Sequence, residues 1–90
     1  MKIVINTCFG GFSVSKKVMK EMGWDSPYDC EDRTDPKLIE IVERLGDEAN
    51  GEYADLVIVD IPEEATDWHL DNYDGSESIV YVVDGKLFWV

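Results

Sequence analysis

The first third of the chain contains two apolar patterns with different periods, and each predicts one element. Residues 3–5 form a β-branched run, which predicts a strand buried on both faces. A glycine loop at residues 8–12 separates this strand from an apolar stripe at helical spacing. That stripe predicts a helix capped by Ser13 or Ser15 and ended by Gly23. The stripe consists of Val14, Val18, Met19 and Met22.

A second helix is predicted at residues 36–45 by signals at both of its ends. Residues 24–35 lack periodicity and form an irregular connection. Thr34 or Asp35 can cap the helix, a proline occupies its first turn, and Gly46 follows its last apolar residue. Its apolar face consists of Leu38, Ile39, Val42 and Leu45.

The second half of the chain reads as strands joined by tight turns. Residues 56–59 form an apolar run, continued by Ile61 and closed by Pro62, and Asp-Gly dipeptides at 74–75 and 84–85 favour hairpins. The three strands around these turns are predicted at 68–73, 78–83 and 86–90. The order is β-α-α-β-β-β-β. We therefore expect a single α+β domain spanning 1–90, with two helices on a mostly antiparallel sheet that ends in a hairpin meander.

Charge is distributed unevenly along this chain of 90 residues, whose formal net charge is −12. The first 20 residues carry +4 and the other 70 carry −16. Between Arg44 and Lys86 lie 41 residues with twelve carboxylates and no lysine or arginine. Such a charge opposes direct DNA or RNA binding, because a polyanion would meet a repulsive field. It favours a basic protein partner instead.

Cysteine content and hydropathy bear on the compartment. No run of 18 apolar residues is present, and residues 3–5 are too short for a signal-peptide core. Cys8 and Cys30 could form one disulfide, but secreted scaffolds of this size usually carry more cysteines, which favours reduced thiols. We expect a soluble, cytoplasmic protein without a membrane association.

The glycine loop and the helix after it are a candidate ligand site. Paired glycines expose backbone N–H groups, and a helix N-terminus with lysines nearby attracts phosphate or carboxylate. Neither known glycine-rich phosphate motif is present, so the loop can equally be a tight strand-to-helix turn. The residues of this hypothesis are Cys8, Gly10, Gly11, Ser13, Lys16 and Lys17.

Catalytic and metal chemistry find little support in the sequence. Cys8 is the only plausible nucleophile and His69 the only histidine, yet nothing indicates that they meet, and Cys8 can equally be a small buried thiol. Zinc-ligand spacing is absent. Residues 72–75 imitate part of a calcium loop but are better explained as a hairpin turn. We expect no metal and no cofactor, and an enzyme is disfavoured.

The acidic stretch supplies a candidate partner site. Its outward carboxylates can offer a basic protein a substitute for phosphates, although acids also simply keep an aromatic-rich domain soluble. The apolar strand at 86–90 either lies centrally in the sheet or seals a homodimer edge. The partner-binding residues of this hypothesis are Glu63, Glu64, Asp67, Asp71 and Glu77.

Three segments of the chain, MKIVINTCFGGFS, RTDPKLIEIVERLG and ANGEYADLVIVDIP, carry a resemblance to known proteins. Together they resemble a group of small phage- and prophage-encoded proteins of unassigned function. The resemblance covers roughly residues 1–75, whereas residues 76–90 depart from the more charged tail of that group. It implies a phage-infected or lysogenic bacterial host and carries over no catalytic residue.

Two main functional hypotheses follow from these observations, beside a less supported third, a thiol enzyme centred on Cys8. The first is a non-enzymatic, acidic accessory protein of phage type that binds and inhibits a basic or nucleic-acid-binding host protein. The resemblance contributes the setting to this hypothesis, and the charge pattern contributes the partner's chemistry. The alternative is a small-molecule or nucleotide binder that uses the loop and helix N-terminus between Cys8 and Lys17.

Overall fold

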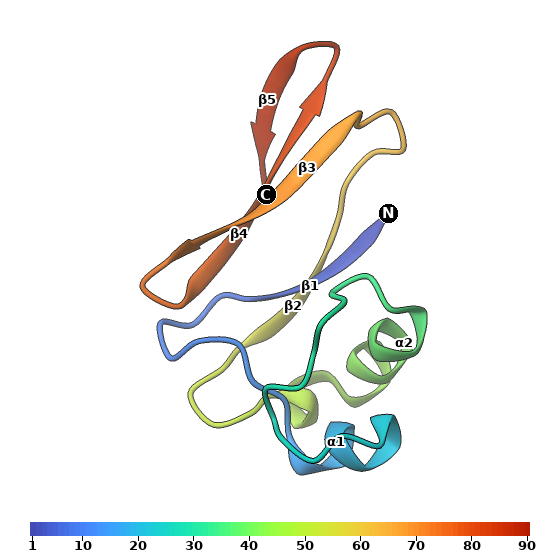
Figure 1. Cartoon of the computed structure of the whole chain (residues 1–90), viewed down its shortest axis with the longest axis vertical. Helices are drawn as coiled ribbons and strands as arrows, with labels where there is room; N and C mark the ends of the chain where they lie inside the picture. The colour runs from blue at the N-terminus through green and yellow to red at the C-terminus, as the bar shows by residue number, and fades with distance from the viewer.

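The computed structural model describes residues 1–90 and arranges them in three layers (Figure 1). A two-stranded sheet forms the middle layer, two helices cover one of its faces, and a three-stranded sheet covers the other. The elements are β1 (Lys2–Asn6), α1 (Lys16–Met22), α2 (Pro36–Leu45), the 3-10 helix η1 (Gly46–Ala49), β2 (Leu56–Asp60), β3 (Asp67–Tyr73), β4 (Ser76–Val83) and β5 (Lys86–Trp89).

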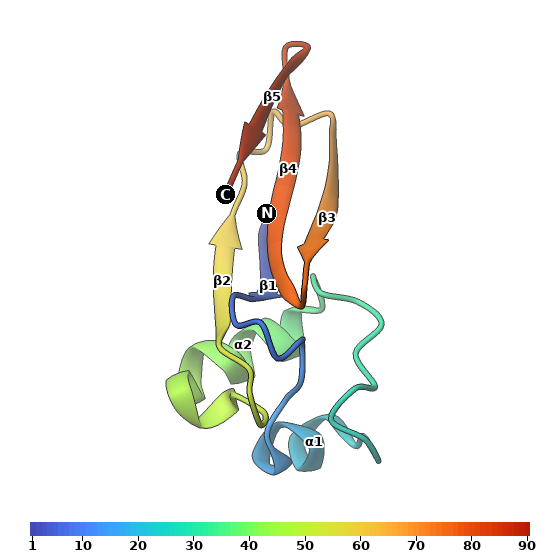
Figure 2. The same ribbon diagram turned by 90° about the vertical axis from the view of Figure 1, so that its left-hand side faces the viewer.

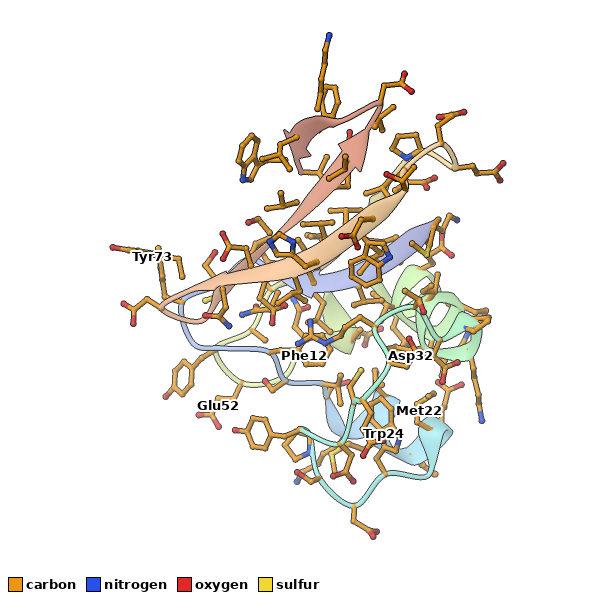
Figure 3. All side chains as sticks on the ribbon, turned by 45° about the horizontal axis from the view of Figure 1, so that its top comes forward. Phe12, Met22, Trp24, Asp32, Glu52 and Tyr73 are labelled. Atoms are coloured by element: carbon orange, nitrogen blue, oxygen red, sulfur yellow. The ribbon has the colours of Figure 1, made fainter.

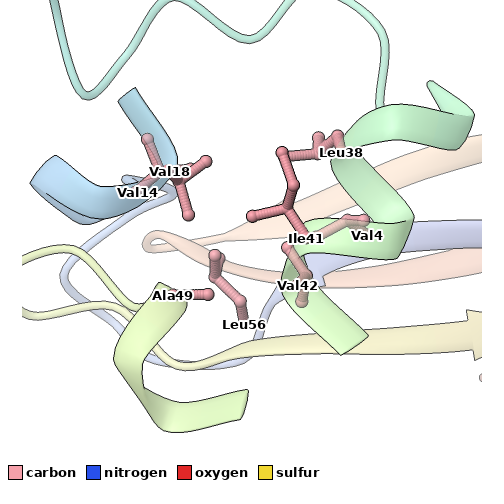
Figure 4. Packing of buried hydrophobic residues seen from close by; sticks show 8 residues of the cluster. All are labelled: Val4, Val14, Val18, Leu38, Ile41, Val42, Ala49 and Leu56. Carbon is pink, nitrogen blue, oxygen red and sulfur yellow. The ribbon is translucent and has the colours of Figure 1, made fainter. Parts of the chain in front are cut away.

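The middle layer is buried on both sides because its strands are apolar on both faces. β1 and β2 pair antiparallel, with Val4 opposite Ile58. Val4 faces the helices, where it joins the larger core cluster (Figure 4). Ile3 and Ile5 point to the other face and pack with Ile79 of β4. The prediction of a strand buried on both faces is therefore confirmed.

Both helices begin and end at predicted cap residues, but Val14 of the predicted stripe lies before α1, in an isolated antiparallel bridge with Asn50. Ser15 caps α1 through a bond from the Val18 amide, and Gly23 ends the helix in a left-handed conformation. Asp35 caps α2, whose bounds equal the predicted range, and Gly46 follows it. The short 3-10 helix η1, which begins at Gly46, was not predicted, since it has no periodicity of its own.

The strands β3, β4 and β5 form a separate antiparallel sheet, in the order β3-β4-β5. Opposite residues of antiparallel strands share a face, so the register assigns each side chain to the inside or the outside. Tyr81 and Phe88 are opposite each other, and their rings stack 5.5 Å apart. The inner face also carries Trp68, Leu70 and Ile79, and the outer face carries His69, Val80, Val82, Leu87 and Trp89.

The β4–β5 hairpin projects beyond the middle layer (Figure 2). β5 is the last strand of its sheet, which settles the choice between a central and an edge position in favour of the edge. Ile79 and Val90 exchange two backbone hydrogen bonds of 2.9 and 3.0 Å. In an antiparallel ladder this pairing directs the N–H and C=O groups of Leu87 and Trp89 toward the open edge. Both side chains are exposed, at 57% and 63%.

The α+β class and the predicted element order are confirmed. The strands divide between two sheets, because β2 ends at Asp60 and the chain then crosses to the far face of the middle layer before β3 begins. None of the helices has both the length and the apolar character that a membrane span requires.

Candidate interaction surface

The fully buried side chain of Asn6 joins three connecting segments at one end of the molecule. Its amide nitrogen donates to the carbonyl oxygens of Cys8 and Gly75, at 2.7 and 2.9 Å. Its amide oxygen accepts from the backbone N–H groups of Asp55 and Cys8, at 2.8 and 3.2 Å. One side chain therefore ties the glycine loop to the loop before β2 and to the β3–β4 turn, and all of its hydrogen-bonding capacity is used.

The glycine loop is closed by these neighbouring segments. A side chain at Gly10 would overlap Tyr53, and one at Gly75 would overlap the carbonyl oxygen of Phe9. Gly51 likewise leaves room for Ser13, whose hydroxyl donates to the carbonyl oxygen of Glu52 at 3.2 Å. The glycines thus permit close backbone approach within the protein.

The residues proposed for a ligand do not converge on a common cavity. Cys8 is half-buried and its backbone is bonded to Asn6, while Ser13 is buried under the loop before β2. Lys17 instead reaches the 3-10 helix and pairs with Glu48 at 2.6 Å. Neither of the two surface depressions is lined by a residue of the glycine loop or of α1.

The thiols and the histidine likewise form no catalytic or metal constellation. Cys8 and Cys30 are free thiols, and no hydrogen bond joins Cys8 to His69. Burial is the largest influence on the Cys30 thiol, and it raises the pKa of that group. No group of three or more histidines, cysteines and acids is placed to hold a metal ion.

Large aromatic side chains are exposed on the segments that Asn6 joins. Phe9, Tyr53 and Tyr73 are 66%, 73% and 79% exposed. The segments lie along one side of the molecule (Figure 1), and Figure 3 shows Tyr73 projecting on the same side as Glu52. We define the aromatic loop surface as these aromatic residues and the exposed acids of the same segments, namely Phe9, Tyr53, Tyr73, Glu52, Asp55 and Asp74.

The acids of the aromatic loop surface lack ion-pair partners, unlike most acids near the helices. Glu52, Asp55 and Asp74 form no salt bridge, and the three segments contain no lysine or arginine. The helix-side acids that do pair with a lysine or arginine are Glu21, Glu40, Glu43 and Glu48. In the case of Glu48, the hydrogen bond from Lys17 and its charge lower the pKa of the carboxyl group.

Most of the acids that the sequence analysis assigned to a partner do face solvent. Glu63 and Glu64 lie in the turn before β3 and are exposed. Asp67 and Asp71 are exposed on the outer face of β3. The interpretation of Glu77 as an outward carboxylate is wrong, because its side chain is only 3% exposed.

Glu77 is held in the interior by Arg33 in a bidentate ion pair. The two guanidinium nitrogens donate to the two carboxylate oxygens at 2.6 and 2.8 Å. The carboxylate also accepts from the backbone N–H of Asn6 at 2.8 Å, and the guanidinium lies 3.6 Å from the ring centre of Phe12. Val4 completes the cluster, since its N–H donates to the Arg33 carbonyl at 2.9 Å. Arg33 and Glu77 thus occupy the open edge of β1, which no strand pairs.

An acidic depression of about 500 Å³ lies on the irregular connection after α1. Its carboxylates already serve the local backbone: Asp29 accepts from two amides, and Asp32 accepts from the Thr34 amide and hydroxyl. The hydroxyl bond from Thr34 is the largest influence that lowers the pKa of Asp32. The depression is lined by Trp24, Tyr28, Asp29, Glu31, Asp32 and Asp35.

No protein-family model, curated protein or solved structure matches this chain. The aromatic loop surface was missed by the sequence analysis, although its parts are visible as aromatic residues beside turn glycines. Phe9 precedes Gly10, and Tyr73 precedes Asp74-Gly75. The sequence held no signal that these two turns meet, since Gly10 and Gly75 are 65 positions apart.

Proposed function

We propose that this chain is a non-enzymatic, acidic accessory protein of phage type that binds, and thereby inhibits, a basic or nucleic-acid-binding host protein. The observation that supports the proposal is the excess of outward carboxylates. Ion pairs engage only six of the 20 acids, namely Glu21, Glu40, Glu43, Glu48, Asp60 and Glu77. The remainder create a negative field that attracts a basic surface and speeds its association.

The acids around β3 contribute to this negative field because no ion pair neutralises them. Glu63, Glu64, Asp67 and Asp71 are exposed and take part in no salt bridge. No lysine or arginine lies between Arg44 and Lys86, and cations from outside this stretch pair only with Glu48, Asp60 and Glu77 of its twelve acids. A partner that binds nucleic acid offers the matching basic surface.

The alternative, a small-molecule or nucleotide site at the glycine loop, has less support. The loop is filled by Tyr53, Ser13 and the β3–β4 turn, and no surface depression includes it. This alternative predicts that phosphorylated compounds raise the melting temperature, which thermal unfolding with and without nucleotide would reveal.

Affinity capture from a bacterial lysate tests the proposed function. We expect the immobilised protein to enrich proteins of high isoelectric point and to release them as salt rises from about 0.1 to 0.5 M, because exposed charges are screened over this range. Changing Glu63, Glu64, Asp67 and Asp71 to amides should weaken retention. Captured proteins that are not basic, or retention that is insensitive to salt, would contradict the proposal.

A further inference from the structure

We propose that the aromatic loop surface is where the protein contacts its partner, and that the occupant is a basic protein segment whose lysine or arginine side chains lie over the exposed rings. This inference rests on the proposed function and adds the place of contact and the chemistry of the segment. Arginine and lysine are attracted to the faces of Tyr and Phe rings, and adjacent carboxylates strengthen such contacts.

Three of the protein's six exposed Phe, Tyr and Trp side chains lie on these segments. Phe9, Tyr53 and Tyr73 each leave at least 66% of their surface in water and belong to neither core cluster. Burying one large aromatic ring in a contact supplies more energy than most other side chains do, and such rings are enriched in binding hot spots. All three lie on segments whose backbones approach one another at Gly10 and Gly75, so a partner that spans these segments can contact them together.

The charge of these segments is complementary to that of a basic occupant. Glu52, Asp55 and Asp74 accompany the rings, none has an ion-pair partner, and no basic residue lies on these segments. A second copy of this acidic chain would meet repulsion here, whereas a segment rich in lysine or arginine would be attracted. The patch therefore suits a basic occupant and opposes self-association.

Hydrogen bonds hold the three segments of the aromatic loop surface rigidly together. Asn6 fixes its three segments with four hydrogen bonds, and Thr7 adds a backbone bond of 2.9 Å to Asp55. Tyr53 and Asp74 hold left-handed conformations, at φ of 61° and 55°, which the surrounding bonds maintain. A surface ordered in advance loses little conformational entropy on binding.

Other exposed surfaces of the molecule give weaker support for a contact with a basic partner. The acidic depression beside Tyr28 uses Asp29 and Asp32 to hold its own loop. The open edge at Leu87 and Trp89 has no acid beside it on the strand, so it gives no reason to prefer a basic partner.

The test uses a fluorescent decapeptide of alternating arginine and glycine, with citrulline in place of arginine as its uncharged control. Anisotropy would measure its affinity for the wild type and for two variants with equal changes in net charge. One carries Glu52→Gln, Asp55→Asn and Asp74→Asn. The other carries Glu63→Gln, Glu64→Gln and Asp67→Asn. We expect the first triple to weaken binding about tenfold and the second about twofold, because only the first removes direct contacts.

The rings are tested separately by Phe9→Ser, Tyr53→Asn and Tyr73→Ser, with Tyr28→Ser as a matched exposed control. Asparagine is chosen at position 53 because it tolerates a left-handed conformation. We expect each of the three changes to weaken binding two- to fivefold, and the control to have no effect. Circular dichroism would verify that each variant is folded, and amide chemical shifts would map the bound peptide to residues 8–12, 51–55 and 72–76.

The outcomes separate this inference from the proposed function. Equal losses from the two charge triples, or shift changes confined to other segments, would overturn the aromatic loop surface and leave a basic partner in place. Binding of the citrulline peptide as strongly as the arginine peptide, or no binding of either to the wild type, would contradict the proposed function itself.

Discussion

Replacing Arg33 with alanine should be the most damaging single change to this domain's stability that the structure identifies. It would leave the Glu77 carboxylate, 3% exposed, with the backbone N–H of Asn6 as its one remaining donor. Breaking a buried ion pair on one side costs about 3–5 kcal/mol, and the low exposure of Glu77 places this case near 4. A domain of this size has a total stability of about 5–13 kcal/mol, so the variant should be folded but marginal.

Changing the other partner of the pair, by Glu77→Gln, should lower the free energy of unfolding by less, about 3 kcal/mol. Arg33 is 20% exposed, so its guanidinium reaches some water and keeps its contact with the Phe12 ring. Replacing both partners, with Arg33→Met and Glu77→Leu, removes both buried charges. That double variant leaves the backbone N–H of Asn6 without an acceptor, which costs about 1–3 kcal/mol. It should therefore be more stable than the Arg33 single variant.

Urea unfolding followed by the fluorescence of the three tryptophans would measure these free energies. Thermal unfolding provides a second readout, in which a loss of 4 kcal/mol lowers Tm by about 20 °C for a domain of this length. Arg44→Met is the control, because its pairs with Glu21 and Glu40 are exposed and should together contribute less than about 1 kcal/mol. An Arg33→Ala cost below about 1 kcal/mol, or a double variant as unstable as the sum of the singles, would refute this account.

Three further predictions concern Asn6, the Lys17–Glu48 pair and the open edge of β5. Asn6→Ala should lower the free energy of unfolding by about 2–4 kcal/mol, because several backbone groups lose their hydrogen-bond partner, and should raise amide exchange in the aromatic loop surface. The control Asn72→Ala, at an exposed turn, should lower it by less than about 1 kcal/mol. Equal losses would contradict the role of Asn6. NMR titration should place the pKa of the Glu48 carboxyl below its ordinary 4.5, and Lys17→Met should return it to that value; the exposed pair contributes its small stabilisation above pH 4.5 and loses it as pH falls through the lowered pKa. Sedimentation should detect weak, reversible dimers through the open edge of β5 only at concentrations of about 100 μM and above, since a single strand contact buries little area. Trp89→Lys should abolish these dimers. A monomer at all concentrations would exclude this edge as a homodimer contact.

Much of the local structure was predictable because its signals lie within a few residues of each other. The bounds of α2 follow from an acidic cap, a proline in the first turn and the glycine after Leu45. The turn at Asp74-Gly75 follows from a dipeptide that adopts positive φ, as both residues do. The class of the domain and the order of its elements needed no more than these signals.

The position of Glu77 could not be predicted, and the reason lies in the pattern of β4. Alternate residues of that strand, Ile79 and Tyr81 on one side and Val80 and Val82 on the other, are equally apolar. Hydrophobic alternation therefore gave no indication of which side faces the core. Packing of Ile79 against β1 decides it, and the same choice turns Glu77 inward to Arg33.

The candidate site shows the same division between sequence and tertiary structure. The sequence by itself determined that this is an acidic α+β domain with glycine turns beside aromatic residues, because composition and turn chemistry are local properties. Only the tertiary structure decided that the turns meet around Asn6 and that their rings face solvent. Contacts between residues about 50 to 70 positions apart depend on how the layers pack, and no local pattern records that packing.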